Sequence, residues 1–330
     1  MEFHEHTKLN NSWQRELSQS ITDPVELCRL LDLLPDFPKT MADDSPDFPL
    51  SVPRGFVDQM EKGNPIDPLL LQVLPCKEEA IDTEGFTVDP VGEYDCVAFN
   101  DRILKKYPGR ALVLASECCG VQCRFCFRRH LPKSGYIKPF ESMDFEPIRN
   151  DTTISEVILS GGDPLMLDDT ELGKLLYYIE KIPHVKRIRI HSRLPVVLPS
   201  RFTPNLAETL KLGKPIYLVL HVNHPNELGE EFFFRRQLFP ETVFMSQTVL
   251  LKGVNDDIDT LARLFETLVD YRIMPYYLHQ LDRVRGAAHF EVPEEIGCRL
   301  MTELRNRLPG YAVPRYVREV AGEAGKTVIG

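Results

Sequence analysis

The chain has 330 residues, and its 39 Lys and Arg against 49 Asp and Glu give a formal charge of −10 at pH 7. Because nucleic-acid binding needs a basic surface, this balance and the lack of a long basic run predict no nucleic-acid partner. The opening residues MEFHEHTKLNNSW have no signal-peptide core, and the apolar runs are too short to span a bilayer. We therefore expect a cytoplasmic protein without a membrane partner.

The first hundred residues are predicted to form a mostly helical N-terminal region. The segment DPVE at 23–26 places a capping acid, a proline at the first helical position and a glutamate at the third, which together predict a helix start. One apolar face would follow from Leu27, Leu30, Leu31 and Leu34. The proline-rich stretch at 35–56 is typical of loops.

Beyond this region, six short apolar runs alternate with segments of helical period. The runs are RALVLASE, SEVILSGG, VKRIRIHS, PIYLVLHV, TVFMSQTVLL and MPYYLHQLD. One helix is predicted in DDIDTLARLFETLVDYR, and a last one around Ile296, Leu300, Leu304 and Leu308. Buried runs that alternate with helices indicate parallel βα units. Six units can form an open doubly wound sheet or an incomplete barrel.

Polar and glycine residues follow every one of the six runs, and they favour the barrel. An open sheet gathers its ligands at one switch point, whereas all strand ends of a barrel converge on one site. The sequence thus predicts an α/β fold with a partial (βα)6 TIM-like barrel at 101–290. The N-terminal region would occupy 1–100, and a C-terminal segment at 291–330 would carry a helix and fold over the barrel mouth.

Four of the eight cysteines lie together in ECCGVQCRFCFRRH at 117–130. The others, Cys28, Cys76, Cys96 and Cys298, are scattered, as small buried residues in a reducing compartment usually are. A structural zinc ion would need four ligands, and the local set would be the three cysteines of C-x3-C-x2-C with His130. Three thiolates, Cys119, Cys123 and Cys126, can instead hold three irons of a cubane and leave the fourth open. Cys118 is expected to be a core or supporting residue and not a ligand.

With Phe125 before its last cysteine, this spacing resembles the signature of radical S-adenosylmethionine enzymes. In that superfamily the open iron binds S-adenosylmethionine, and a glycine-rich stretch after the second strand receives the amino group of that cofactor. The stretch SGGDP lies at that place, so the resemblance assigns Ser160, Gly161, Gly162 and Asp163 to the cofactor site. A simple glycine turn between strand and helix would give the same letters.

The resemblance continues along the chain over about residues 50–327. YPGRALVLASECCGVQCRFCFRRH, SGGDPL, SRLPVV, HVNHPNE, SQTVLLKGVND, MPYYLHQLD, GAAHF and VPRYVREVAGEAGK are similar, in order, to the lysine 2,3-aminomutase family. The opening NSWQRELSQSITDPVELCRLLDL further resembles the short forms that make (R)-β-lysine for translation elongation factor P. An element at 60–75, MEKGNPIDPLLLQVLP, is similar too.

The resemblance implies an isomerase that converts L-lysine to (R)-β-lysine. Its cofactors would be a [4Fe-4S] cluster, S-adenosylmethionine and pyridoxal 5′-phosphate. A flavodoxin or ferredoxin would supply the electron, and the ligase that loads elongation factor P would use the product. An aminomutase for another pathway or amino acid, and a zinc-stabilised interaction module, are the alternatives.

The resemblance also assigns roles to single residues. Lys326 would hold pyridoxal phosphate, although a lysine near a terminus is usually solvated. The other assignments are Lys106, Tyr107 and Arg110 near pyridoxal phosphate, Gln247 at S-adenosylmethionine, Arg128 at the substrate carboxylate, and Asp282 and Glu319 at the substrate ε-ammonium. Lys106 stands where longer family members have arginine, and Glu319 where they have aspartate, which moves the charge by about 1.5 Å. Either acid could instead pair with Arg283 or Arg318 at the surface.

Overall fold

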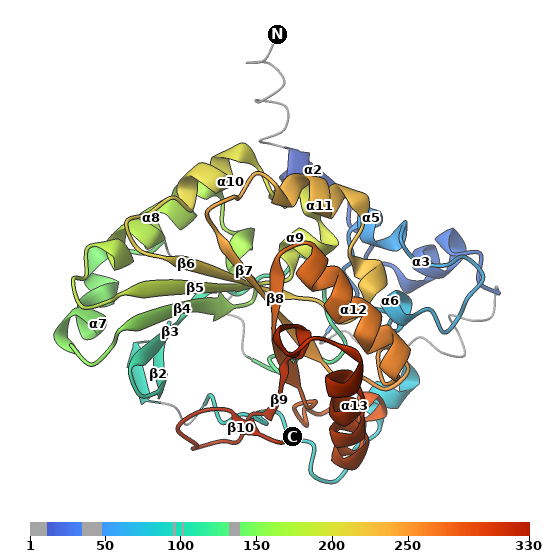
Figure 1. Cartoon of the computed structure of the whole chain (residues 1–330). Helices are drawn as coiled ribbons and strands as arrows, with labels where there is room; N and C mark the ends of the chain where they lie inside the picture. Colours follow the sequence, from blue (N-terminus) through green and yellow to red (C-terminus); the bar gives the residue numbers. More distant parts are fainter. Residues whose placement is uncertain (1–11, 35–47, 95–96, 101, 132–138) are drawn as a thin grey trace.

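A single sheet organises the molecule (Figure 1). The computed structural model describes residues 12–34, 48–94, 97–100, 102–131 and 139–330. Within these ranges the sheet has ten strands, each beside its neighbour in sequence. They are β1 Val97–Asn100, β2 Ile103–Tyr107, β3 Arg110–Ser116, β4 Glu156–Gly161, β5 Arg187–Ser192, β6 Ile216–His221, β7 Val243–Val249, β8 Ile273–His279, β9 Arg315–Arg318 and β10 Thr327–Val328.

The six predicted runs form β3 to β8, which pair in parallel throughout. The longer helices between them are α8 Asp169–Glu180, α10 Pro204–Thr209, α11 Glu230–Arg236 and α12 Ile258–Asp270, with short α7 Glu146–Asn150 and α9 Leu194–Val197. In Figure 1 the series from α7 to α12 follows the outside of the sheet. Because helices cover it, β4 is buried at all six positions. The predicted mixed α/β fold is confirmed.

The predicted helix in the segment 256–272 is α12. Asp257 caps it by accepting a hydrogen bond from the Thr260 amide at 2.9 Å. The residues on its inner face are buried: Leu261, Leu264, Phe265 and Leu268. The last predicted helix is α13 Glu294–Arg307, in which Leu300, Met301 and Leu304 are buried.

Four strands at the two ends of the sheet were missed by the sequence analysis. β1 and β2 run antiparallel ahead of β3, whereas β9 is parallel to β8 and antiparallel to β10. All four strands are short, and β2 (ILKKY) and β9 (RYVR) also carry charges. They therefore lack the continuous apolar run by which β3 to β8 were found.

The described part of the N-terminal region contains short helices separated by irregular stretches: α2 Ser12–Leu17, α3 Pro24–Leu30, α5 Arg54–Val57, α6 Pro68–Leu71 and the 3-10 turn η1 Lys77–Ala80. Asp23 caps α3 through the Val25 amide at 2.9 Å. The apolar face extends less far than predicted, since α3 ends at Leu30 and Leu34 is exposed. Much of the predicted loop at 35–56 lies outside the described residues, and α5 begins within it. No helix in the described ranges is long and apolar enough to cross a bilayer.

Candidate active site

Every residue that the sequence assigned to the site lines one cavity. It opens beside the carboxyl ends of the parallel strands, and the centres of water molecules can occupy about 260 Å³ of it. The assigned residues that line it are Lys106, Tyr107, Arg110, Cys119, Cys123, Cys126, Arg128, Ser160, Gly161, Gly162, Asp163, Gln247, Asp282, Glu319 and Lys326. Side chains from both ends of the sheet and from the C-terminal segment therefore meet at one place.

The three cysteines of the motif are half-buried in the loop after β3. Within the described residues, no three His, Cys, Asp or Glu side chains are already gathered as a ligand set for a metal ion. A cubane does not require that, because each thiolate binds a different iron and the sulfurs need not meet at a point. Three thiols on one cavity wall, with one position left for a further ligand, therefore fit a [4Fe-4S] cluster.

Cys118 was expected to be a core or a supporting residue, and because it is exposed, the first of these expectations is wrong. Its backbone is what matters, because the Cys118 carbonyl accepts a hydrogen bond from the Asp163 amide at 2.8 Å. This contact brings the cysteine loop against the loop that follows β4. A Cβ on Gly162 would lie 2.4 Å from the Cys118 carbonyl oxygen, so only glycine fits there.

The SGGDP stretch is shaped by the same close approach. Gly161 ends β4 with φ +108°, and a Cβ there would lie 2.5 Å from the Ser116 carbonyl oxygen. The Asp163 carboxylate accepts hydrogen bonds from the Ser192 hydroxyl at 2.7 Å and from the backbone amides of Leu165, Arg193 and Leu194 at 2.8 to 3.0 Å. Burial raises the pKa of Asp163, against these bonds, which favour the carboxylate. Its side chain thus ties the loops after β4 and β5 together.

Arg128 is already held by a carboxylate that the sequence analysis missed. Its Nε and Nη2 donate to the two oxygens of Glu93 at 2.8 and 2.6 Å, and its Nη1 donates to Ser160 Oγ at 2.9 Å and to the Gly161 carbonyl at 3.0 Å. Burial opposes ionisation of Glu93, but the Arg128 guanidinium outweighs it and lowers the pKa. Nothing in the local sequence VGEYD distinguishes Glu93 from a surface acid.

Glu319 is the meeting point of three donors. Lys326 Nζ lies 2.6 Å from one carboxylate oxygen and Lys106 Nζ 2.9 Å from the other, and the Tyr107 hydroxyl donates as well. Only 4 % of the Glu319 side chain is exposed. Burial opposes its ionisation, but Lys326 and Lys106 outweigh this effect and lower the pKa. Lys326 is therefore not a solvated terminal lysine.

Asp282 faces the same cavity, and among the described residues it has no comparable partner at contact distance. Burial raises its pKa to about 6, although the Lys326 charge works against the shift. The alternative surface pairings of the two acids are wrong, because Arg283 pairs with Glu291 at 2.7 Å and Arg318 with Glu294 at 2.8 Å.

Three histidines at strand ends also line the cavity beside Gln247: His191 on β5, His221 on β6 and His279 on β8. Burial lowers the pKa of each, that of His221 to about 3, so all three are neutral. Polar residues at the ends of these runs were recognisable in the sequence, but nothing there singled out the histidines. A neutral imidazole can donate or accept one hydrogen bond without bringing a charge into a site that already holds several.

A loop with three cysteines, set against glycines at the carboxyl ends of parallel strands, defines an iron–sulfur enzyme of the radical S-adenosylmethionine type. Residues 108–192 match the family described as "4Fe-4S single cluster domain". This range contains the cysteine loop and the SGGDP stretch.

Comparison with curated proteins extends the match to nearly the whole chain. The L-lysine 2,3-aminomutase of Escherichia coli is 44 % identical over 97 % of this chain and 95 % of its own, and that of Haemophilus influenzae is 42 % identical over 96 % and 95 %. The enzyme of Clostridium subterminale is 33 % identical over 97 % of this chain and 78 % of its own. The chain belongs to the L-lysine 2,3-aminomutase family of isomerases, whose cofactors are an iron–sulfur cluster, S-adenosylmethionine and pyridoxal phosphate.

Proposed function

We propose that the protein is a 2,3-aminomutase that converts L-lysine to (R)-β-lysine. One observation carries the proposal: three cysteines, the cofactor lysine and two acids that suit an ammonium group line a single cavity. When bound, S-adenosylmethionine on the cluster supplies the radical and pyridoxal phosphate carries the migrating amino group. In this proposal Cys119, Cys123 and Cys126 hold the cluster, and Lys326 holds pyridoxal phosphate near Lys106, Tyr107 and Arg110.

The remaining residues would bind and orient the substrate. Asp282 and Glu319 offer negative charge to the ε-ammonium, and Arg128 offers a guanidinium to the carboxylate. Because Glu93 occupies one edge of Arg128, the substrate carboxylate must use the outer Nη2 hydrogen or displace Glu93. Holding both ends of lysine fixes which carbon faces the radical. Gln247 and the stretch 160–163 would border S-adenosylmethionine.

The proposed architecture is an incomplete (βα)6 barrel at 101–290, flanked by regions 1–100 and 291–330. Sequential parallel strands with helices outside support it. Further support comes from the bond between Tyr107, at the end of β2, and Glu319, which follows β9. Residues seven strands apart can touch only if the sheet curls strongly.

We further propose that the product serves modification of elongation factor P in the cytoplasm. The identities of 44 % and 42 % over almost complete relatives, against 33 % for the longer clostridial enzyme, support the short-form assignment. A flavodoxin or ferredoxin would deliver the electron, and the elongation factor P ligase would consume the β-lysine.

Anaerobic incubation with reductant, S-adenosylmethionine, pyridoxal phosphate and L-lysine tests the activity directly. Chiral analysis should find (R)-β-lysine. A parallel reaction with glutamate should give little product, because two acids repel its side-chain carboxylate, and a reaction with arginine tests whether a guanidinium is accepted in place of the ammonium. Borohydride reduction and peptide mapping should place the pyridoxyl group on Lys326. A label on another lysine would refute the cofactor assignment, and β-arginine or β-glutamate as main product would refute the substrate.

A further inference from the structure

Arg193 follows β5 directly, and its side chain reaches the cysteine loop. Its Nη1 lies 2.8 Å from the sulfur of Cys123, and only 5 % of the residue is exposed. A guanidinium stays protonated in proteins and has only donors. It therefore presents a permanent positive charge and an N–H bond to this sulfur, whatever the pH.

A buried network fixes the direction of the Arg193 side chain. Its Nη2 donates to Gln72 Oε1 at 2.7 Å and lies 3.3 Å from Glu227. Gln72 in turn donates to Glu227 at 3.0 Å and accepts from Asn223 at 2.8 Å. Each of these three partners is at most 1 % exposed. Because such a network leaves few alternative rotamers, the contact with Cys123 is held and not incidental.

The same network connects the N-terminal region to the cysteine loop. Gln72 caps the end of α6, and its backbone carbonyl accepts a hydrogen bond from the Arg124 amide at 2.9 Å. Arg124 lies next to Cys123 in the loop. Gln72 thus holds both the arginine that approaches the sulfur and the backbone that carries that sulfur.

We propose that Arg193 is a positioning residue that donates a hydrogen bond to the cluster sulfur of Cys123 and thereby raises the reduction potential of the cluster. The proposal rests on Cys123 being a cluster ligand. Reduction adds negative charge to the cluster, and hydrogen bonds to its sulfurs and nearby positive charge stabilise that charge. The effect is large in a buried site because the effective dielectric constant is low. Gln72 and Glu227 act through Arg193 by holding its guanidinium in place.

Potentiometric titration of the anaerobically purified holoprotein, followed by electron paramagnetic resonance of the reduced cluster, tests this directly. It is done without S-adenosylmethionine, so that any contact of Arg193 with that cofactor does not contribute. Arg193→Gln should shift the midpoint potential to more negative values, and Arg193→Lys should shift it less, because the charge remains. Gln72→Leu, which leaves Arg193 unanchored, should shift it in the same direction. Arg201→Lys is the matched control, since Arg201 is also fully buried but donates to the Leu165 carbonyl.

Iron and sulfide are counted for each variant. A midpoint equal to wild type in Arg193→Gln with full iron would overturn the proposal. If that variant loses its iron, Gln72→Leu decides by the same criterion, and loss of iron from both would show that the network serves only cluster assembly. A wild-type protein that binds no cluster would instead overturn the cluster assignment itself.

Discussion

At the scale of single residues, Glu319 shows how the cavity balances its charges. Two ammonium groups and a phenol share one carboxylate. Under the proposed function the substrate ε-ammonium needs the same carboxylate, so Lys326 occupies part of the substrate site when no cofactor is bound. Attachment of the cofactor to Lys326 would then uncover Glu319 for lysine. The extra methylene of glutamate, relative to aspartate, lets this carboxylate reach donors from both ends of the sheet.

Lys326→Met should therefore bind free lysine at least about tenfold more tightly than wild type when both lack pyridoxal phosphate, a difference of about 1.4 kcal/mol. The reason is that the substrate ammonium no longer displaces a resident one. Calorimetric titration of the two cofactor-free proteins measures the effect. Lys252→Met, at an exposed lysine, is the control and should bind as wild type does. Equal affinities for Lys326→Met and wild type would show that Glu319 does not bind the substrate ammonium.

Replacement of Asp282 is predicted to stabilise the protein and to weaken its use of lysine. The pKa of Asp282 is raised from 3.8 to about 6 by burial. The folded protein therefore keeps a proton that the unfolded chain has lost, and stability falls as pH rises through this window. Asp282→Asn removes the buried charge and should stabilise the protein above pH 7 by up to about 3 kcal/mol, the equivalent of two pKa units, with little change near pH 4.

The same substitution should weaken lysine use sharply, while cluster and pyridoxal absorbance remain. Wild type should lose lysine affinity as pH falls through about 6, where Asp282 becomes protonated. Urea unfolding near pH 4 and above pH 7 measures the effect on stability, and lysine titration of the variant measures the effect on binding. Stability that is the same at both pH values in wild type would argue against a raised pKa, and unchanged kinetics would return Asp282 to a structural role.

Which of these residues could be found from the sequence depends on how local their signals are. The cysteines and Lys326 stand in short motifs, so the resemblance located them. Glu93, His191 and His279 come from segments far apart in the sequence, and only the folded chain brings them to one cavity. Arg128 shows the limit most clearly: its type and position were predicted, but its pairing with Glu93 depends on how residues 89–94 cross the cavity.

At the scale of elements, the loops after β3 and β4 are packed against each other with no space for a side chain. Gly162→Ala would place a Cβ 2.4 Å from the Cys118 carbonyl oxygen, and backbone must move to relieve it. We expect this variant to lose most of its iron, because the displaced segment carries the cluster ligands.

Gly173→Ala is the matched control for this substitution. Gly173 lies within α8, and a Cβ there would make an ordinary 3.6 Å contact with Thr209. Alanine in a helix should stabilise the protein by roughly 0.5–1 kcal/mol and leave iron unchanged. Iron assays and thermal melts of both variants check the prediction, and full iron in Gly162→Ala would show that the two loops can separate without harm.

The strands that the sequence predicted have regular burial patterns. β4 is buried at every position, and β3, β5 and β7 largely alternate buried with more accessible positions, so their apolar residues recur in a recognisable way. β2 and β9 lie toward the ends of the sheet and carry charges: Lys106 of β2 lines the cavity, whereas Arg315 and Arg318 of β9 are exposed. These charges interrupt the apolar pattern by which the two strands would have been recognised.

At the scale of the whole molecule, the N-terminal region holds the cysteine loop in place through ion pairs and hydrogen bonds. Glu79 in η1 receives both Arg124 and Arg129 of that loop, with the bonded atoms 2.5 to 2.7 Å apart. Gln122 of the loop also donates its amide to the Ser51 carbonyl at 3.0 Å. The N-terminal region therefore holds the loop that carries Cys119, Cys123 and Cys126.

Glu79→Gln should destabilise the protein by about 3–5 kcal/mol, because it leaves two buried guanidinium groups short of negative charge. Thermal and urea unfolding of the cofactor-free protein measure this without interference from iron. Glu171→Gln is the control: its partner Lys174 is half exposed, and removal of such a pair costs about 0.5 kcal/mol or less. Equal losses of stability in Glu79→Gln and Glu171→Gln would mean that Glu79 does not hold the cysteine loop.

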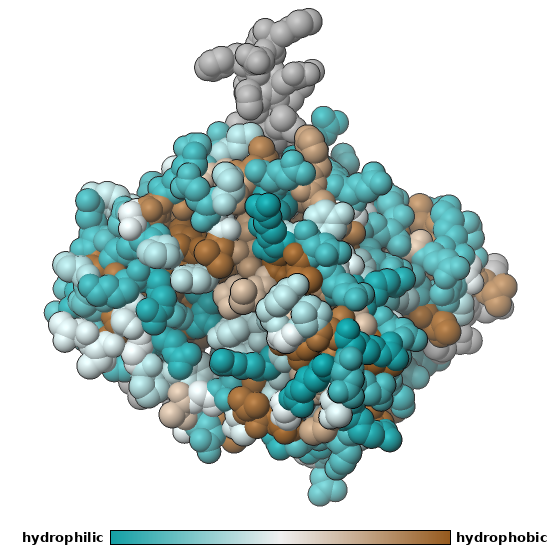
Figure 2. All heavy atoms as spheres, viewed as in Figure 1, coloured by the Kyte–Doolittle hydropathy of each residue, from teal (hydrophilic) through white to brown (hydrophobic). Residues whose placement is uncertain are grey.

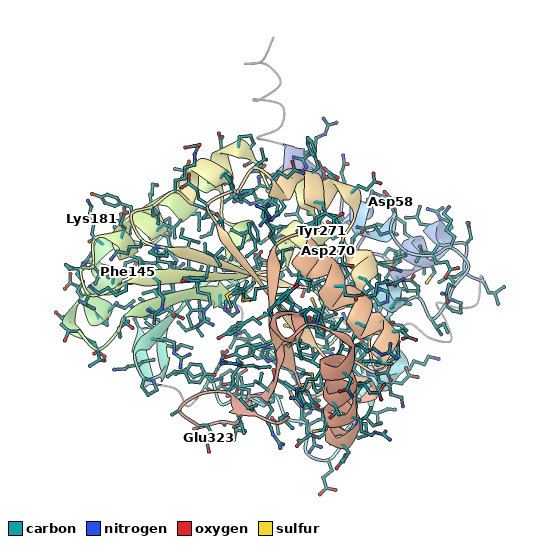
Figure 3. The ribbon with its side chains drawn as sticks, viewed as in Figure 1. Asp58, Phe145, Lys181, Asp270, Tyr271 and Glu323 are labelled. Carbon is teal, nitrogen blue, oxygen red and sulfur yellow. The ribbon has the colours of Figure 1, made fainter. Side chains whose placement is uncertain are left out.

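On the side of the molecule seen in Figure 2, apolar residues form small groups separated by hydrophilic ones. The turn between β9 and β10, which contains Glu323, projects at the lower edge of the molecule, away from the central strands (Figure 3). The C-terminal segment therefore combines an outward-facing turn with inward-facing Glu319 and Lys326.

The contact of Glu319 with Lys106 and Tyr107 joins two distant parts of the sheet. Within the described residues, side chains of β2 and of the segment after β9 meet here although β2 and β9 do not pair as strands. A ladder consists of many hydrogen bonds, whereas this junction consists of two side chains, Lys106 and Tyr107, that contact one carboxylate. A single substitution at Glu319 would therefore remove both contacts that join β2 to the segment after β9.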